Sequence, residues 1–297
     1  MLYLGLAVAC SLAIAMIFKL SERRGLDRVA LLTVNYAVAF AVAGGLHVAG
    51  FGAVGEGLTL SLGLTALGVW TGALFIGGFV LFSYAILLAG MSLATGVMRL
   101  AVALPFLASW LIWNEVPTTA QFIGLAVAGV AFFLIARRGD APAAEVEMGD
   151  THPAGWKVAG VLVLLFLSGG AVDVSMKAFS EGYAATNSQA QFLLLVFGVA
   201  FALGLGWVVV RGIRTGQWLR REEVMLGLVL GLVNYGSAEF ILQAIARLRG
   251  PFVFPVNNIA IVFGAALLGV FVWKERLSRA NQVGLGLAAL ALLLLGL

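Results

Sequence analysis

The chain has 297 residues, of which 62% are hydrophobic and only 11% are charged. A soluble domain carries about 25% charged residues, so this sequence cannot cover its surface with polar groups and lipid must be its solvent. The net charge of +4 does not indicate nucleic-acid binding, because the basic residues punctuate apolar runs as membrane topology requires. Cys10 is the sole cysteine and His47 and His152 lie far apart, which excludes an internal disulfide and argues against a metal site.

Ten apolar runs are long enough to cross a bilayer, which takes about 20 residues of helix. In chain order, the predicted spans are 2–18, 28–46, 66–88, 92–113, 118–136, 156–178, 188–210, 223–246, 251–272 and 279–297. Basic residues follow the first span rather than precede it, which favours an uncleaved anchor helix over a signal peptide. A cytoplasmic linker, 139–155, is predicted between a first five-helix repeat, 1–138, and a second, 156–297.

The distribution of basic residues predicts how the chain is oriented. When the loops are assigned alternately to the two sides, fourteen of the 18 Lys and Arg residues fall on one side and three on the other, with Arg99 inside a span. The positive-inside rule then places the linker in the cytoplasm and both termini outside. We expect a multi-pass protein of the inner (plasma) membrane.

An internal repeat relates the two halves of the chain. Matching segments recur in the same order, offset by 158 to 161 residues: Trp113-Asn114-Glu115 and Trp273-Lys274-Glu275, Gly124 and Gly284, Ala128 and Ala288, Val38-Ala39-Phe40-Ala41 and Val199-Ala200-Phe201-Ala202. Because each repeat has five spans, an odd number, the second must insert upside down. The predicted fold class is an all-α membrane protein with ten transmembrane helices in two inverted five-helix repeats, an arrangement typical of secondary transporters.

Motifs in the last third of the chain carry a family resemblance. They are Phe254-Pro255-Val256-Asn257-Asn258, Trp273-Lys274-Glu275-Arg276-Leu277-Ser278, and Asn281 to Gly284 leading into a Leu/Ala-rich helix, together with Asn234-Tyr235 and Asn35-Tyr36. The chain resembles the drug/metabolite transporter superfamily, in its ten-helix EamA-type branch, over essentially its whole length. The resemblance implies ten helices around a central cavity, no cofactor, and usually export of amino acids or other metabolites. In the first half the corresponding motif, Trp113 to Pro117, is degenerate.

Ionisable residues inside predicted spans are candidate site residues, because each costs about 2.5–3.5 kcal/mol on insertion scales. On the eighth span Tyr235, Glu239 and Gln243 form one polar stripe at helical spacing. Glu239 is predicted to bind substrate or a proton; the alternative is a structural carboxylate paired with a basic residue. Arg99 is suited to hold a substrate carboxylate or phosphate, but neutralising Glu239 or snorkelling to the interface are equally open.

Two further groups are assigned to gating or hinge roles. Asp173 and Lys177 are spaced to pair along the sixth span and are predicted to act as a gate or anchor. Pro255 removes a backbone donor and is a candidate hinge, with a simple kink as the alternative. Asn257 and Asn258 follow it and are predicted to satisfy the backbone or contact substrate. The repeated Gly124-xxx-Ala128 and Gly284-xxx-Ala288 motifs predict close packing of the fifth and tenth spans, within one chain or between protomers.

These features favour a secondary active transporter over an enzyme. The expected function is proton-coupled export of a small organic metabolite, such as an amino acid, by alternating access, in a monomer or homodimer. The alternatives are a flippase of a lipid-linked sugar, an uptake permease, and a membrane-embedded lipid-modifying enzyme. The enzyme is the weakest, since the sequence contains no HExxH, no aspartate-rich run and no G-x-S-x-G. No catalytic residue is predicted.

Overall fold

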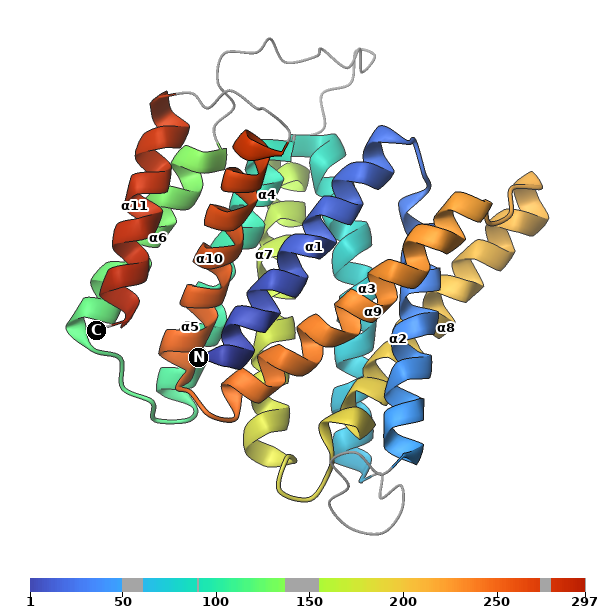
Figure 1. Cartoon of the computed structure of the whole chain (residues 1–297), viewed down its shortest axis with the longest axis horizontal. Helices are drawn as coiled ribbons and strands as arrows, with labels where there is room; N and C mark the ends of the chain where they lie inside the picture. Colours follow the sequence, from blue (N-terminus) through green and yellow to red (C-terminus); the bar gives the residue numbers. More distant parts are fainter. Residues whose placement is uncertain (50–60, 90, 137–154, 273–278, 297) are drawn as a thin grey trace. The chain divides into compact units, whose positions relative to one another are not determined.

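The chain is helical throughout the part that the structure describes. A computed structural model describes residues 1–49, 61–89, 91–136, 155–272 and 279–296, and no strand occurs among them. The helices are α1 (Leu2–Arg23), α2 (Arg28–Val48), α3 (Leu62–Ala89), α4 (Met91–Leu100), α5 (Ala103–Leu111), α6 (Thr119–Ala136), α7 (Gly155–Gly182), α8 (Gln189–Thr215), α9 (Arg221–Ile245), α10 (Gly250–Phe271) and α11 (Arg279–Gly296) (Figure 1). The predicted all-α class is confirmed.

The lengths and apolar composition of these helices fit a membrane protein. Seven helices in the described residues are long and apolar enough to cross a bilayer: α1, α2, α3, α7, α8, α9 and α10. Three shorter apolar helical stretches are Val97–Leu111, Thr119–Leu134 and Gln282–Leu295. Transmembrane character is therefore confirmed, while the count of ten spans and their inversion remain predictions. The linker, apart from Gly155, and the Trp273 to Ser278 motif lie outside the described residues.

The predicted span 92–113 is not one continuous helix. It is interrupted between α4 and α5 at Ala101 and Val102. Pro105 has no backbone N–H to donate to the Ala101 carbonyl one turn earlier. The N–H of Leu104 donates to that carbonyl instead, at 3.0 Å, which tightens the turn to i→i+3 spacing. The predicted span 92–113 therefore consists of two helices, and Pro105 is the physical reason for the interruption.

The chain divides into two compact units. Unit 1 comprises Met1–Gly77 and Ser175–Leu248, and unit 2 comprises Gly78–Val174 and Arg249–Leu297. Unit 1 therefore contains α1, α2, α8 and α9, and unit 2 contains α4, α5, α6, α10 and α11. Helices α3 and α7 contribute residues to both. Each unit thus combines helices from both halves of the sequence.

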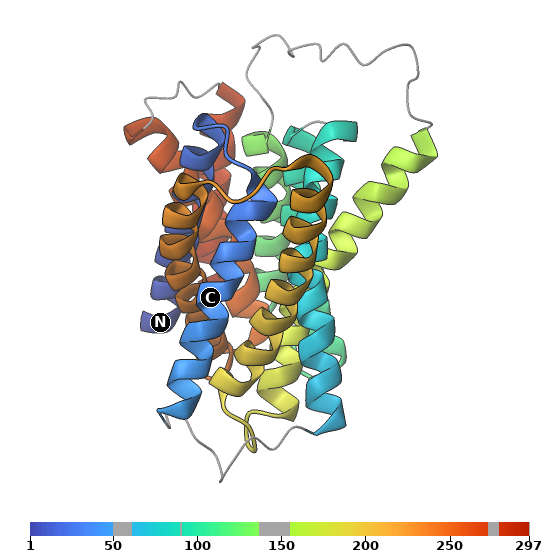
Figure 2. The same ribbon diagram turned by 90° about the vertical axis from the view of Figure 1, so that its right-hand side faces the viewer.

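In unit 1, α2 packs against both α8 and α9 (Figure 2). Glycines bring α9 close to α2. A methyl group at Gly227 would lie 2.6 Å from Cβ of Val34, and one at Gly231 would lie 2.6 Å from the carbonyl oxygen of Asn35. Only a residue without Cβ permits this approach of two backbones.

Helix α3 approaches α8 in the same way, also within unit 1. A methyl group at Gly68 would lie 2.6 Å from Cβ of Leu195. One at Gly72 would lie 2.5 Å from the carbonyl oxygen of Val196. Both glycines are buried, so unit 1 contains two glycine-mediated helix contacts of the same kind.

In unit 2, α6 packs against α11. Ala128 and Ala288, the matched small residues of these helices, are both fully buried. A methyl group at Gly124 would lie 2.9 Å from Cγ of Leu295. The predicted close packing of the fifth and tenth spans is confirmed, and it occurs within one chain.

The glycine contact between α9 and α2 yields a prediction about stability. We expect Gly231→Ala to lower the free energy of unfolding by about 2 kcal/mol, because its methyl group would collide with the α2 backbone. Gly206→Ala on α8 is the matched control, because a methyl group there has no neighbour within 4 Å. It should be neutral or slightly stabilising, since alanine favours helix. Thermal unfolding in detergent measures both, and equal melting temperatures would contradict the role of this contact.

Candidate functional site

The polar stripe predicted on α9 exists in unit 1. The Tyr235 hydroxyl donates to Glu239 Oε2 at 3.5 Å, and Gln243 Nε2 donates to Glu239 Oε1 at 2.9 Å. Glu239 and Gln243 are half-buried and Tyr235 is buried. The Glu239 carboxylate is thus held by two neutral donors from its own helix, as their i, i+4 spacing predicted.

Gln243 extends this stripe toward the end of α9. Its Nε2 also donates to Gln189 Oε1 of α8, at 2.5 Å. The Arg247 guanidinium donates to Gln243 Oε1 and, at 2.9 Å, to the Gln243 carbonyl oxygen, and it lies 4.5 Å from the ring centroid of Tyr3. Gln243 is therefore hydrogen-bonded to both the Glu239 carboxylate and the exposed Arg247 guanidinium. Gln189 and Arg247 were not singled out from sequence, although Arg247 continues the same four-residue spacing.

Aromatic rings of unit 1 lie beside Tyr235, the first residue of the stripe. The Phe197 ring lies 6.2 Å from that of Tyr235 and 6.3 Å from that of Tyr36, with which it is stacked. Phe75 meets Phe197 edge to face at 5.8 Å. These rings come from α2, α3, α8 and α9, so Tyr235, which donates to Glu239, is part of an aromatic cluster.

A second polar cluster lies in unit 2, at the interruption between α4 and α5. Arg99, in the last turn of α4, donates from Nη1 to Asn258 Oδ1 of α10 at 3.4 Å. Asp173 of α7 lies near enough to Arg99 for their charges to interact. Arg99 also suits the negative end of the α4 dipole. Pro105 indicates a bend in this span from sequence, and the structure places the interruption directly after the turn that holds Arg99.

Pro255 lies near the start of α10, so its effect on the helix is local. The carbonyl that it leaves without a helical donor belongs to Pro251, in the first turn, and α10 continues to Phe271. Asn258 Nδ2 donates to the carbonyl oxygen of Phe254 at 3.1 Å. Asn258 thus bonds to the backbone as well as to Arg99. Asn257 Oδ1 is buried and has no hydrogen-bond partner among the residues that the structure describes.

The buried lysine of α7 has an ion-pair partner on its own helix. Lys177 is 1% exposed, and its Nζ forms an ion pair with Glu181 Oε1 at 2.6 Å. Asp173, one turn earlier, follows Gly169 on the face of α7 that contacts Ala101, next to Arg99. A lysine buried to this degree needs such a partner for its charge. Lys177 is therefore part of the packed interior. The gating role predicted for Asp173 and Lys177 stays a prediction.

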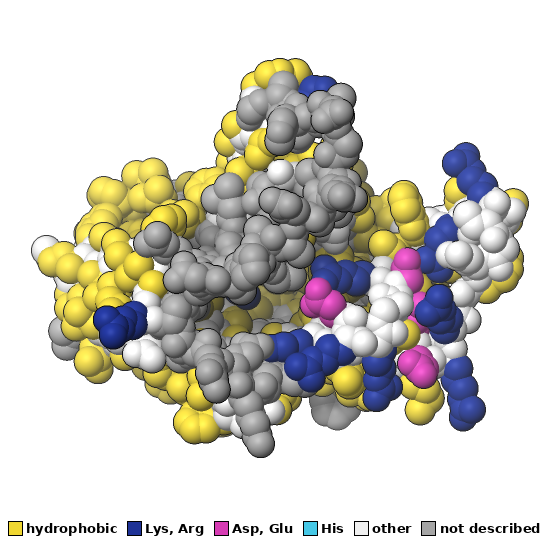
Figure 3. Space-filling model, turned by 90° about the horizontal axis from the view of Figure 1, so that it is seen from above, with side chains coloured by type: hydrophobic (Ala, Val, Ile, Leu, Met, Phe, Trp, Pro, Cys, Tyr) yellow, Lys and Arg dark blue, Asp and Glu magenta, His cyan; other side chains and the backbone are white. Residues whose placement is uncertain are grey.

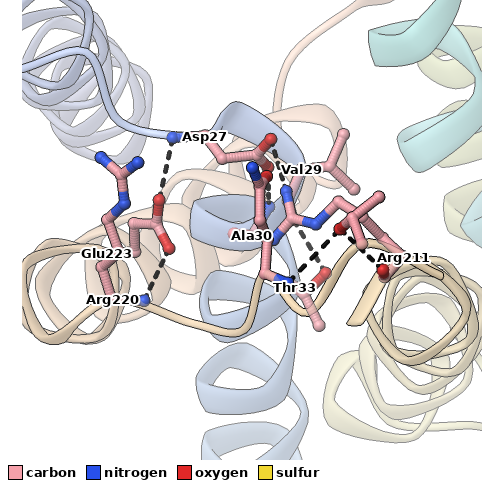
Figure 4. Close-up of polar contacts among 9 residues, drawn as sticks. Asp27, Val29, Ala30, Thr33, Arg211, Arg220 and Glu223 are labelled. Atoms are coloured by element: carbon pink, nitrogen blue, oxygen red, sulfur yellow. Dashed lines mark hydrogen bonds and ion pairs between the residues drawn. The ribbon is translucent and has the colours of Figure 1, made fainter. Parts of the chain in front are cut away.

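A charged cluster ties together three helix ends of unit 1 (Figure 4). The Asp27 carboxylate accepts from the N–H of Ala30 at 2.7 Å, which caps α2, and forms an ion pair with Arg211 Nη1 of α8 at 2.6 Å. The buried Glu223 carboxylate of α9 accepts from the backbone N–H of Asp27 at 3.0 Å and of Arg220 at 2.8 Å. From the sequence alone these basic residues indicate only topology, because their partners lie at the ends of other helices.

The predicted site residues therefore form two groups, one in each unit. Tyr235, Glu239 and Gln243 lie in unit 1 with Lys177, whereas Arg99, Asp173, Pro255, Asn257 and Asn258 lie in unit 2. In the part of the chain that the structure describes, no three His, Cys, Asp or Glu side chains gather as metal ligands.

Comparison with known proteins supports the fold but assigns no activity. No family model matches the chain. An uncharacterised protein of Haemophilus influenzae is 24% identical over 291 residues, which cover 94% of this chain and 92% of that protein. A solved crystal structure superposes with a TM-score of 0.73 at 15% identity and covers 99% of this chain and 94% of that chain. At this identity the likeness shows the fold alone.

The two roles of Asp27, helix cap and ion-pair partner, can be separated by substitution. We expect Asp27→Ala to lower the free energy of unfolding by about 1–2 kcal/mol, because the α2 cap and the pair with Arg211 are both lost. Asp27→Asn should cost about half as much, since asparagine still caps the helix. Thermal unfolding in detergent measures both, with Arg214→Gln on exposed α8 surface as the control. Equal losses in the two variants would show that the cap contributes nothing.

Proposed function

We propose that this chain is a secondary transporter of the drug/metabolite transporter superfamily, in its ten-helix EamA-type branch. It moves a small organic metabolite, in the export direction, by alternating access. In such a carrier, two related halves of opposite orientation exchange conformations, so that an opening on one side of the membrane becomes an opening on the other. The proposal therefore depends on an inverted relation between the halves.

Matching glycine contacts in unit 1 are the observation that carries this proposal. Gly68 and Gly72 of α3 meet Leu195, Val196 and Val199 of α8, and Gly227 and Gly231 of α9 meet Val34, Asn35 and Val38 of α2. Corresponding glycines are 159 residues apart and corresponding partners 161. In the first contact the glycines come from the first half; in the second they come from the second half. An exchange of this kind is what a two-fold relation between halves produces.

Helices that correspond in the two halves also pack against each other. Within unit 1, α2 packs against α8, and the matched rings of Phe40 and Phe201 stack with their centroids 6.4 Å apart. Within unit 2, α6 packs against α11 and α5 against α10. Such contacts between corresponding helices support a symmetry axis that relates the halves.

Glu239 is the group best suited to couple transport to protons. It has no ion-pair partner within 4.0 Å among the described residues, and its hydrogen-bond donors, Tyr235 and Gln243, are neutral. A proton on this carboxylate would therefore leave no buried cation unpaired, whereas protonating one member of a buried ion pair is costly. The adjacent aromatic cluster keeps the carboxylate beside apolar surface, where a change of charge has the largest effect.

The distribution of charge at the ends of unit 1 supports the predicted orientation. Arg28, Arg211, Arg214, Arg220 and Arg221 lie at the end that carries the α1–α2 and α8–α9 connections, where Figure 3 shows basic side chains gathered. Basic residues collect on the cytoplasmic side of inner-membrane proteins. We therefore assign this end to the cytoplasm and both termini to the outside.

Metabolite export provides the test of function. Cells overexpressing the wild-type chain should accumulate one or a few metabolites in the medium, measured by untargeted mass spectrometry against deletion cells. We expect Glu239→Gln, at equal membrane abundance, to lower this accumulation at least about tenfold, because the coupling carboxylate can no longer exchange a proton. Glu222→Gln, an exposed glutamate in the first turn of α9, is the matched control and should export normally. Export by Glu239→Gln at the wild-type rate would exclude Glu239 as the coupling group.

Reporter fusions test the orientation. An enzyme that folds only outside the cytoplasm should be active when fused after Leu297 and inactive when fused after residue 145. A reporter active only in the cytoplasm should give the opposite pattern. A cytoplasmic C-terminus would refute this topology.

A further inference from the structure

The Arg99 cluster of unit 2 has the composition of a ligand site. Arg99 lies at the end of α4, beside the interruption that Pro105 imposes, and α7 is packed closely against the same place. A methyl group at Gly169 would lie 3.2 Å from Cβ of Ala101, and one at Gly170 would lie 2.8 Å from its carbonyl oxygen. Asp173 follows Gly169 on the same face of α7, one turn on. These contacts bring a carboxylate to the guanidinium from a different helix.

Arg99 has more hydrogen-bonding capacity than its surroundings use. A guanidinium carries five N–H donors, and in the described residues its one hydrogen bond is the 3.4 Å contact with Asn258 Oδ1. Asn258 is held in turn by its bond to the Phe254 carbonyl oxygen, so it orients the guanidinium from one side. Arg99, Asp173 and Asn258 all retain accessible surface. A charged face in an apolar helix bundle is expected to line the protein interior rather than lipid.

We propose that Arg99, oriented by Asn258, binds the carboxylate group of a monoanionic organic substrate, and that Asp173 is the resident counter-ion which this carboxylate displaces. The inference rests on the proposed transport function and names the substrate class. The planar fork of an arginine matches a carboxylate with two parallel hydrogen bonds, which the single long bond to Asn258 leaves available.

Charge balance favours a carboxylate over the other ligand classes. Arg99 is the only cation among the three residues, so a single negative charge matches it once Asp173 has withdrawn. A phosphate dianion would face one guanidinium and the Asp173 carboxylate, with no second cation from these residues. A cationic ligand would be repelled by Arg99. The adjacent Asn257 is left out of the site, because successive residues of a helix do not face the same way.

The counter-ion role distinguishes this site from a structural ion pair. If Asp173 competes with the substrate for Arg99, its removal frees the guanidinium and binding becomes tighter. If Asp173 only balances the charge of Arg99 within the fold, its removal leaves a half-buried cation uncompensated, and binding becomes weaker or is lost. The two interpretations therefore predict opposite effects of one substitution.

Ligand-induced thermal stabilisation of the purified full chain tests the proposal. The probes are lactate, pyruvate and benzoate, with their methyl esters as uncharged controls and inorganic phosphate as a second anion. We expect the carboxylates to raise the melting temperature of the wild type, and the esters and phosphate to leave it unchanged. Arg99→Gln should abolish the response, and Arg99→Lys, which keeps the charge without the fork, should weaken apparent affinity about tenfold. Asp173→Asn should tighten it about fivefold.

Controls and outcomes separate this proposal from the transporter itself. Arg214→Gln removes an exposed arginine outside the site and should respond as the wild type does. Lack of any response to the three carboxylates, an equal response to phosphate, or weaker binding by Asp173→Asn would overturn the carboxylate site. Metabolite export that persists unchanged in Arg99→Gln would overturn the site and leave the transporter standing. Carboxylate binding that depends on Arg99, in a chain that exports nothing, would overturn the transporter and leave the site.

Discussion

The close approach of helices at glycine is the constraint on which the rest of the structure depends. In lipid the helices gain little hydrophobic energy from associating, so they are held by packing and must come close enough to pack well. Gly72 and Gly231 let α3 and α9 press against the backbones of α8 and α2. Because α2 and α8 also pack against each other, these contacts connect four helices of unit 1. The Glu239 stripe and the aromatic cluster beside it are built on this frame.

The polar groups are distributed less symmetrically than the helices. The glycine contacts recur in both halves, but Glu239 and Arg99 have no charged counterpart at the matching position of the other half. Their supports differ in kind as well. Glu239 is held by neutral donors from its own helix, whereas Arg99 meets groups from two other helices, Asn258 of α10 and Asp173 of α7. The two halves therefore share this way of packing helices but not the polar groups of the two sites.

The sequence predicted the features that depend on local rules and missed those that depend on contacts between helices. Hydropathy located the helices, and i, i+4 spacing predicted the Tyr235, Glu239 and Gln243 stripe. Pro105 is also such a local signal, since the carbonyl that loses its helical donor is identified by counting back four residues. Spacing along one helix favours Asp173 and Glu181 equally as partners of Lys177, and the structure shows an ion pair with Glu181. Asp27, the ion-pair partner of Arg211, lies at the end of another helix. Residue spacing within one helix cannot predict such a contact.

The interruption of the fourth predicted span links the fold to the proposed chemistry. A backbone carbonyl without its helical donor is expensive in lipid and is tolerated where protein covers it. At Ala101 the Leu104 N–H satisfies that carbonyl, and Gly170 brings α7 over the same point. The packing of α7 over the interruption also places Asp173 on the side of α4 where Arg99 lies. Pro105 thus interrupts the span inside an apolar bundle. Arg99 lies at the end of α4 that this interruption creates, where α7 and α10 both approach it.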